Sequence, residues 1–289
     1  MVFTRERLVG VVVAVVLGCA AFVYGLRWLE SAMTFQPDRM TEKERGLTPE
    51  GAESVWFNSA DGTRLHGWFF ESQSAPETAT VIFFHGNGGN IGTVSWVGQR
   101  FAKRGFDVLL FDYRGYGASE GVAAYESDLY ADGDAAVAFV RNEKGARPER
   151  IVLYGHSLGT AIVADVASRG TFGAVVLESG FSSASSVAAG ALPWLPKWVH
   201  FLGKNRFDSA RKLANVKSPI LITHGDPDTT IPTGEAQTLF ASANEPKKLL
   251  IFRGAGHNVF GNLGEPYLSQ VEQFIRESLV EAAQPMARL

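Results

Sequence analysis

The chain has 289 residues, of which 46% are hydrophobic and 20% charged, with a formal net charge of −3. This length accommodates an N-terminal segment and one domain of about 250 residues with a sizeable core. Without a basic excess, nucleic acid is not an expected partner. The single cysteine, Cys19, excludes a disulfide, a thiolate nucleophile and a cysteine metal site from the domain.

An apolar run lies near the N-terminus. Residues 8–26 carry no charge, and this is about the length of one transmembrane helix. A cleaved signal peptide, or a lipoprotein signal ending at Cys19, is the alternative, although the run exceeds the usual apolar core of a signal peptide. We expect residues 1–30 to form a single-pass membrane anchor. Basic residues flank both ends, and of the two orientations we favour an extracytoplasmic domain.

After a charged linker over residues 31–50, the pattern alternates between strands and helices. Residues 54–58 and 64–71 flank Asp61-Gly62 and predict an antiparallel hairpin. Continuous apolar runs then predict strands buried on both faces of a parallel sheet, at residues 80–84, 107–111, 151–154, 174–177, 220–223 and 248–252. Amphipathic stretches at 94–104, 125–142 and 158–169 predict helices on both faces. The fold class is therefore α/β, with ligand-binding loops at the carboxyl ends of the strands.

One segment interrupts this alternation. Residues 186–206 are rich in proline and aromatic residues, and we interpret them as a small lid inserted after a strand. Its candidate substrate contacts are Trp194, Leu195 and Trp198, although the same side chains could belong to the core. The domain is expected to span residues 51–284, followed by a tail at 285–289.

Gly155-His156-Ser157-Leu158-Gly159 directly follows a predicted strand and opens a predicted helix. A serine on such a sharp turn needs small neighbours, because the strained backbone lies close to adjacent elements. The turn also exposes the hydroxyl at a helix N-terminus, where partial positive charge favours a developing anion. Ser157 is therefore the candidate nucleophile.

The same pattern occurs a second time, in Gly117-Ala118-Ser119-Glu120-Gly121. Ser119 lies several residues beyond the end of its strand, and no helix begins at the next residue. The strand–turn–helix requirement is not met there, so we expect Ser119 to be a loop residue.

A serine hydroxyl needs an imidazole to accept its proton and a carboxylate to fix the imidazole tautomer. His257 follows the last strand between small residues and satisfies the chain order serine, aspartate, histidine. Two aspartates, Asp226 and Asp228, follow the penultimate strand and compete for the role of the acid. Position alone only slightly favours Asp228.

The loop His85-Gly86-Asn87-Gly88-Gly89-Asn90 ends the strand at residues 80–84. Glycines after a strand allow backbone N–H groups to point into a cleft, and an oxyanion hole takes one donor from such a loop. We predict the N–H groups of Asn87 and Leu158 as the two donors. No metal or cofactor is expected.

Together these motifs resemble the α/β-hydrolase family, and most of all its membrane-anchored, Bem-forty-six-like serine hydrolases. The resemblance covers roughly residues 34–279 and rests on the loop at 85–90, the run at 112–119, the serine turn at 155–159, and the segments Gly225–Pro232 and Gly256–Asn258. It implies an α/β-hydrolase fold and assigns the acid to Asp228. Members of that branch include esterases, monoacylglycerol lipases and protein depalmitoylases, but the N-terminal cysteine cluster of the depalmitoylases is missing here.

These observations predict a serine hydrolase that cleaves carboxylic esters through an acyl-enzyme. The apolar lid and the membrane anchor favour a small-molecule acyl or lipid ester. The same triad could cleave a thioester of an acylated protein, or an amide. The alternative to an enzyme is an inactive, membrane-tethered binding module that has the same fold but no catalytic activity.

Overall fold

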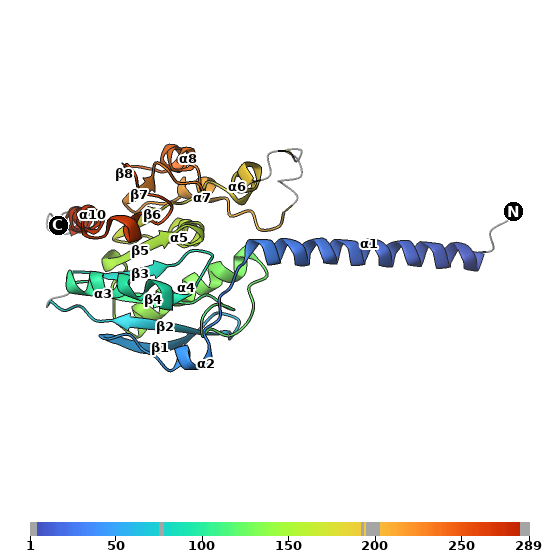
Figure 1. Cartoon of the computed structure of the whole chain (residues 1–289), viewed down its shortest axis with the longest axis horizontal. Helices are drawn as coiled ribbons and strands as arrows, with labels where there is room; N and C mark the ends of the chain where they lie inside the picture. The colour runs from blue at the N-terminus through green and yellow to red at the C-terminus, as the bar shows by residue number, and fades with distance from the viewer. Residues whose placement is uncertain (1–4, 75–77, 192–193, 195–202, 284–289) are drawn as a thin grey trace. The chain divides into compact units, whose positions relative to one another are not determined.

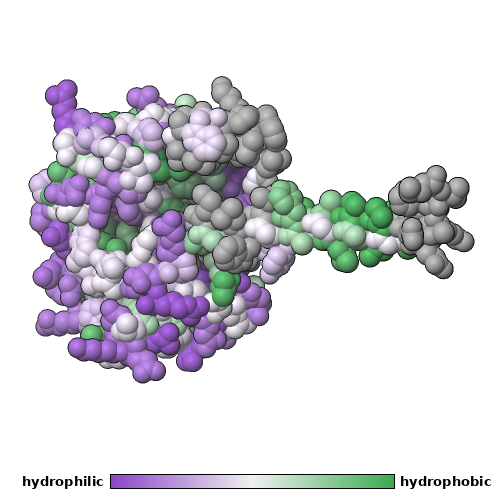
Figure 2. Space-filling model, turned by 45° about the vertical axis from the view of Figure 1, so that its right-hand side comes forward, coloured by the Kyte–Doolittle hydropathy of each residue, from purple (hydrophilic) through white to green (hydrophobic). Residues whose placement is uncertain are grey.

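The computed structural model describes residues 5–74, 78–191, 194 and 203–283. The chain divides into two compact units, Met1–Gln36 and Pro37–Leu289. The first contains a single helix, α1 (Arg5–Thr34), within which the 24 residues Val9–Ala32 are long and apolar enough to cross a membrane. Figure 2 shows apolar side chains along this helix in green. The helix continues to Thr34, past residue 30, where the predicted anchor ends.

The second unit is built on one eight-stranded sheet with the strand order β1-β2-β4-β3-β5-β6-β7-β8. The predicted hairpin is present, since β1 (Ala52–Asn58) pairs antiparallel with β2 (Arg64–Phe70). β2 also runs antiparallel to β4, and all later neighbours are parallel. The remaining strands are β3 (Thr80–Phe84), β4 (Asp107–Phe111), β5 (Ile151–His156), β6 (Ala174–Glu178), β7 (Ile220–Gly225) and β8 (Lys247–Phe252).

Helices cover both faces of this sheet, as predicted (Figure 1). On one face, Val81 and Phe83 of β3 share a core cluster with Phe101 and Val271 from two of the helices. The alternate residues of β3 point the other way, where Phe84 contacts helices of the opposite layer near Gly133. The helices are α2 (Glu42–Arg45), α3 (Ser95–Lys103), α4 (Glu126–Asn142), α5 (Leu158–Ser168), α6 (Ala184–Ala191), α7 (Ser209–Leu213), α8 (Gly234–Ser242), α9 (Val259–Leu263) and α10 (Glu265–Ala283), with short 3₁₀ turns η1 (Ile91–Val94) and η2 (Pro148–Arg150).

One strand prediction needs correction. The apolar run at residues 248–252 predicted a strand buried on both faces, but β8 forms the edge of the sheet and its residues are only partly buried or exposed. Ile251, for example, is 39% exposed. An apolar run predicts a strand, but its place in the sheet depends on strand pairing that the run does not encode.

Candidate active site

Ser157 stands on the turn that joins β5 to α5. Its φ of 53° lies in the left-handed region, which is strained for a residue with a side chain. The two glycines of the motif make this turn possible. A Cβ on Gly155 would lie 2.6 Å from the Gly159 carbonyl oxygen, and one on Gly159 would lie 2.0 Å from the Phe84 carbonyl oxygen. No larger residue fits at either position without moving backbone.

The structure brings Ser157, His257 and Asp228 together from three separate loops. Nε2 of His257 lies 2.9 Å from Oγ of Ser157, and Nδ1 lies 2.7 Å from Oδ2 of Asp228. An ionised carboxylate only accepts hydrogen bonds, so Nδ1 donates and neutral Nε2 accepts from the serine hydroxyl. The imidazole is partly exposed, at 23%, while the Asp228 carboxylate is fully buried. The three groups form a continuous hydrogen-bonded chain.

The Asp228 carboxylate is fixed by its own turn. Oδ1 accepts hydrogen bonds from the N–H groups of Thr230 and Ile231, at 2.8 and 2.9 Å. The fully buried His224 approaches from the strand end. Its Nε2 is 2.8 Å from the Ile231 carbonyl oxygen and 3.2 Å from Oδ2 of Asp228. These contacts leave Oδ2 pointing at His257.

Asp226, the other candidate for the acid, contacts the backbone of the histidine loop and not the imidazole. It is exposed, and its Oδ1 accepts a hydrogen bond of 2.8 Å from the N–H of Gly254. Gly254 precedes His257 by three residues, so Asp226 braces the loop that carries the imidazole without contacting the ring.

The loop after β3 approaches the serine closely. A Cβ on Gly86 would lie 3.4 Å from the Ser157 Cβ, so this backbone borders the nucleophile turn. The next residue, Asn87, has its side-chain oxygen held at 2.8 Å by the hydroxyl of the buried Tyr116. Leu158 is the first residue of α5, so its N–H lacks an acceptor within the helix. The two predicted oxyanion donors therefore belong to segments that border Ser157.

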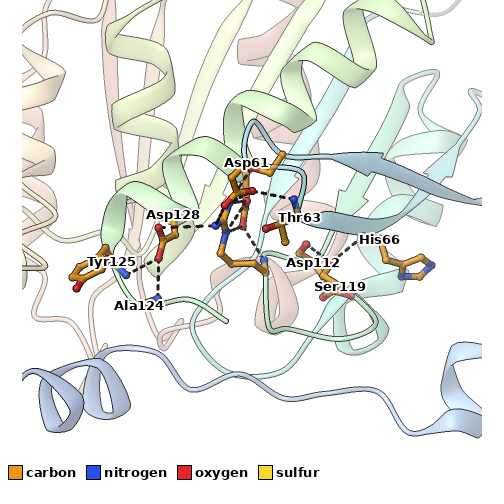
Figure 3. A network of polar contacts seen from close by, with 11 residues as sticks. Asp61, Thr63, His66, Asp112, Ser119, Ala124, Tyr125 and Asp128 are labelled. Atoms are coloured by element: carbon orange, nitrogen blue, oxygen red, sulfur yellow. Dashed lines mark hydrogen bonds and ion pairs between the residues drawn. The ribbon is translucent and has the colours of Figure 1, made fainter. Parts of the chain in front are cut away.

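Ser119 is fully buried and hydrogen-bonded to backbone on both sides. Its Oγ donates to the Asp112 carbonyl at 2.7 Å and accepts from the His66 N–H at 2.9 Å (Figure 3). The neighbouring Arg114 is also buried, and its guanidinium binds Asp132 and Asp61, each with a shortest distance of 2.7 Å. Through these contacts, Ser119 and Arg114 hold the loop after β4 against the β1–β2 hairpin.

The buried ionisable side chains of His85 and Asp112, in the loops after β3 and β4, were not singled out from the sequence. Burial lowers the pKa of His85 to about 4 and raises the pKa of Asp112 to about 7. Their side chains lie 3.6 Å apart, measured from His85 Nε2 to Asp112 Oδ1. Burial in the folded domain is the largest cause of both pKa shifts, and a local sequence motif carries no signal for it.

Of the predicted lid contacts, Trp194 is 75% exposed, while Leu195 and Trp198 lie outside the described residues. The lid region begins in α6, which follows β6. Within the described part of the chain, no group of three or more His, Cys, Asp or Glu side chains is arranged to hold a metal ion.

Comparison with known proteins agrees with this architecture. The Hydrolase_4 family model, whose description is "Serine aminopeptidase, S33", matches residues 75–212. The uncharacterized protein YfhR of Escherichia coli (strain K12) is 35% identical over 258 residues, covering 85% of this chain and 87% of the relative. Alpha/beta hydrolase domain-containing protein 17B of Xenopus laevis is 36% identical over 203 residues, covering 70% of this chain and 67% of the relative.

Among solved structures, the Pyrococcus furiosus esterase Pf2001 superposes with a TM-score of 0.70 at 21% identity. The match covers 85% of this chain and 98% of that chain. At this identity the likeness shows the fold, and the predicted α/β-hydrolase fold is confirmed. Sequence relatives and structural neighbours thus agree, and the chain belongs to the α/β-hydrolase family.

Proposed function

We propose that this protein is a serine hydrolase that cleaves carboxylic esters, with Ser157 as nucleophile, His257 as general base and Asp228 as the acid that orients it. The observation that carries the proposal is the hydrogen-bonded chain from Ser157 Oγ through both ring nitrogens of His257 to Asp228 Oδ2. Its two distances, 2.9 and 2.7 Å, are within the range for proton transfer between positioned groups.

In the acylation step, Ser157 Oγ forms a bond to the acyl carbon while its proton moves to His257 Nε2. The tetrahedral oxyanion is held by the N–H groups of Asn87 and Leu158. When the bond to the leaving alcohol breaks, His257 returns the proton to the alkoxide. Water then attacks the acyl-enzyme by the same route, releasing the carboxylic acid and restoring Ser157. Asp228 remains ionised and stabilises the imidazolium.

An acyl or lipid ester is the substrate class we favour. Support comes from α1, which is apolar enough to place the enzyme at a membrane as a Bem-forty-six-like hydrolase, and from esterases among the structural neighbours. The description of the matching family model, a serine aminopeptidase, favours an N-terminal amide as the second candidate. The same acyl-enzyme chemistry serves both substrates.

A matched substrate panel tests this proposal. The purified full chain is assayed on p-nitrophenyl esters of increasing acyl length, on acyl thioesters and on aminoacyl anilides, with Ser157→Ala as the blank. We expect Ser157-dependent ester turnover that rises with acyl length. Faster turnover of aminoacyl anilides than of any ester would replace the ester assignment with the amide one. Equal turnover by wild type and Ser157→Ala would contradict the proposed function.

A further inference from the structure

Glu178 is the last residue of β6, and it lies at the carboxyl edge of the sheet between two strands of the candidate site. It pairs with His156 at the end of β5 and with Thr223 in β7. The residue is 1% exposed, so its carboxylate is enclosed by protein. It thus sits directly beside the strand end that presents Ser157.

Glu178 holds both the serine turn and the histidine loop. Its backbone carbonyl accepts a hydrogen bond of 2.9 Å from the N–H of Ser157. Its side-chain Oε1 accepts one of 2.8 Å from the N–H of Phe260. Phe260 is in the first turn of α9 and follows His257 by three residues. One residue therefore links the backbone at the nucleophile to the backbone that carries the base.

The second carboxylate oxygen is hydrogen-bonded to a chain of hydroxyls. Oε2 accepts a hydrogen bond of 2.5 Å from the hydroxyl of Tyr154. That hydroxyl lies 2.8 Å from the hydroxyl of Tyr267, which is 2.9 Å from Thr223 Oγ1. Within the described residues Glu178 has no salt bridge, so its acceptors are satisfied by one backbone N–H and a chain of hydroxyls.

An ionisable side chain is a costly way to fill a core, since burial of an unpaired charge is unfavourable. An apolar residue would fill the same space but could not accept the Phe260 N–H. Accepting the Phe260 N–H is therefore a contribution to the position of α9 that an apolar side chain could not make.

We propose that Glu178 is a positioning residue. It sets the distance between His257 and Ser157 by anchoring α9 to β6, the strand next to the one that presents Ser157. This inference rests on the proposed function of Ser157 and His257. A displacement of about 1 Å at reacting groups can reduce turnover by about 100-fold. The link to Phe260 is the contact that would prevent such a displacement.

Two substitutions separate reach from charge. Glu178→Gln keeps the length of the side chain and an amide oxygen that can accept the Phe260 N–H, but removes the charge. Glu178→Asp keeps the charge but shortens the side chain by one methylene. Tyr154→Phe is the matched control, because it removes the hydroxyl at Oε2 and leaves the Phe260 link intact.

Three quantities are measured for each full-length variant: kcat and KM on the best ester, the melting temperature, and the NMR resonance of the His257 Nδ1 proton. We expect Glu178→Asp to lower kcat by about tenfold or more with KM nearly unchanged, and to shift the His257 resonance. Glu178→Gln and Tyr154→Phe should keep kcat within about threefold of wild type and leave the resonance in place.

The inference is overturned if Glu178→Asp has the wild-type kcat and resonance, or if Glu178→Gln loses as much activity as Glu178→Asp. A fall in melting temperature alone, without a change in kcat or resonance, also overturns it. Failure of the proposed function looks different, since wild type and Ser157→Ala would then hydrolyse the ester equally. The His257 resonance still decides the positioning role in that case.

Discussion

Residues 117–121 and 155–159 share the same glycine and serine spacing but fold into different surroundings. Ser157 has a positive φ, stands between a strand and a helix, and has Oγ 2.9 Å from an imidazole. Ser119 is fully buried, and its hydroxyl is hydrogen-bonded to two backbone groups. The spacing of a motif therefore indicates a turn, whereas the elements on either side of it determine whether the serine can react.

The two aspartates after β7 repeat this comparison in one loop. Asp228 contacts the ring of His257, whereas Asp226 contacts the backbone of Gly254. We expect Asp228→Asn to reduce kcat by about 10⁴-fold, because the amide favours the wrong imidazole tautomer. Asp226→Asn should keep kcat within about threefold, since its amide oxygen can still accept the Gly254 N–H. Steady-state ester hydrolysis by both variants tests this, and the reverse order would move the acid to Asp226.

Ser119→Ala should act on stability and not on chemistry. The substitution leaves the buried N–H of His66 without its acceptor, which costs about 1–3 kcal/mol of the free energy of unfolding. Chemical denaturation measures that loss, and ester kinetics on the folded variant should give the wild-type kcat. A large fall in kcat without loss of stability would contradict the structural role of Ser119.

Tyr116 links the loop after β4 to the loop after β3, because its hydroxyl donates a hydrogen bond of 2.8 Å to the side-chain oxygen of Asn87. Without this contact the predicted oxyanion donor at Asn87 is less well fixed. We expect Tyr116→Phe to lower kcat by about tenfold, less than the loss of an oxyanion donor itself, with KM little changed. If KM rises instead and kcat stays constant, Tyr116 contributes to substrate binding and not to the oxyanion loop.

A further prediction concerns pH. The pKa of Asp112 is raised from 3.8 to about 7 by burial, so the native state binds more protons than the unfolded state between these values. Stability is therefore full below pH 3.8 for this group and declines as pH rises towards 7. We expect the free energy of unfolding of wild type, relative to Asp112→Asn, to fall over that range by at most about 1.4 kcal/mol per pH unit. A difference that does not vary with pH would contradict a raised pKa.

Much of the fold was predictable because buried strands and amphipathic helices leave periodic patterns in the sequence. The strands before β8 were predicted in type and order of appearance, and the serine turn was recognisable from its glycines. The edge position of β8 was not, because pairing between strands is a property of the whole sheet. Short helices such as α7, with five residues, are too brief to show a period.

The residues of the candidate site also fall into those that the sequence predicted and those that only the folded structure brought to notice. Ser157 and His257 were predicted from local settings that follow strands, whereas Asp228 was preferred over Asp226 mainly through the family resemblance. Glu178 and His224 were not singled out, since their importance comes from contacts made only after folding. Glu178 lies 82 positions from Phe260 in the chain, and no local signal reports that hydrogen bond.

Ser157, and not Ser119, is the nucleophile in the proposed reaction. Labelling with a fluorophosphonate probe tests this assignment most directly, using wild type, Ser157→Ala and Ser119→Ala, with mass spectrometry to locate the adduct. We expect an adduct on Ser157 in wild type and in folded Ser119→Ala, and no labelling of Ser157→Ala. Labelling that persists in Ser157→Ala and is lost in Ser119→Ala would contradict the assignment.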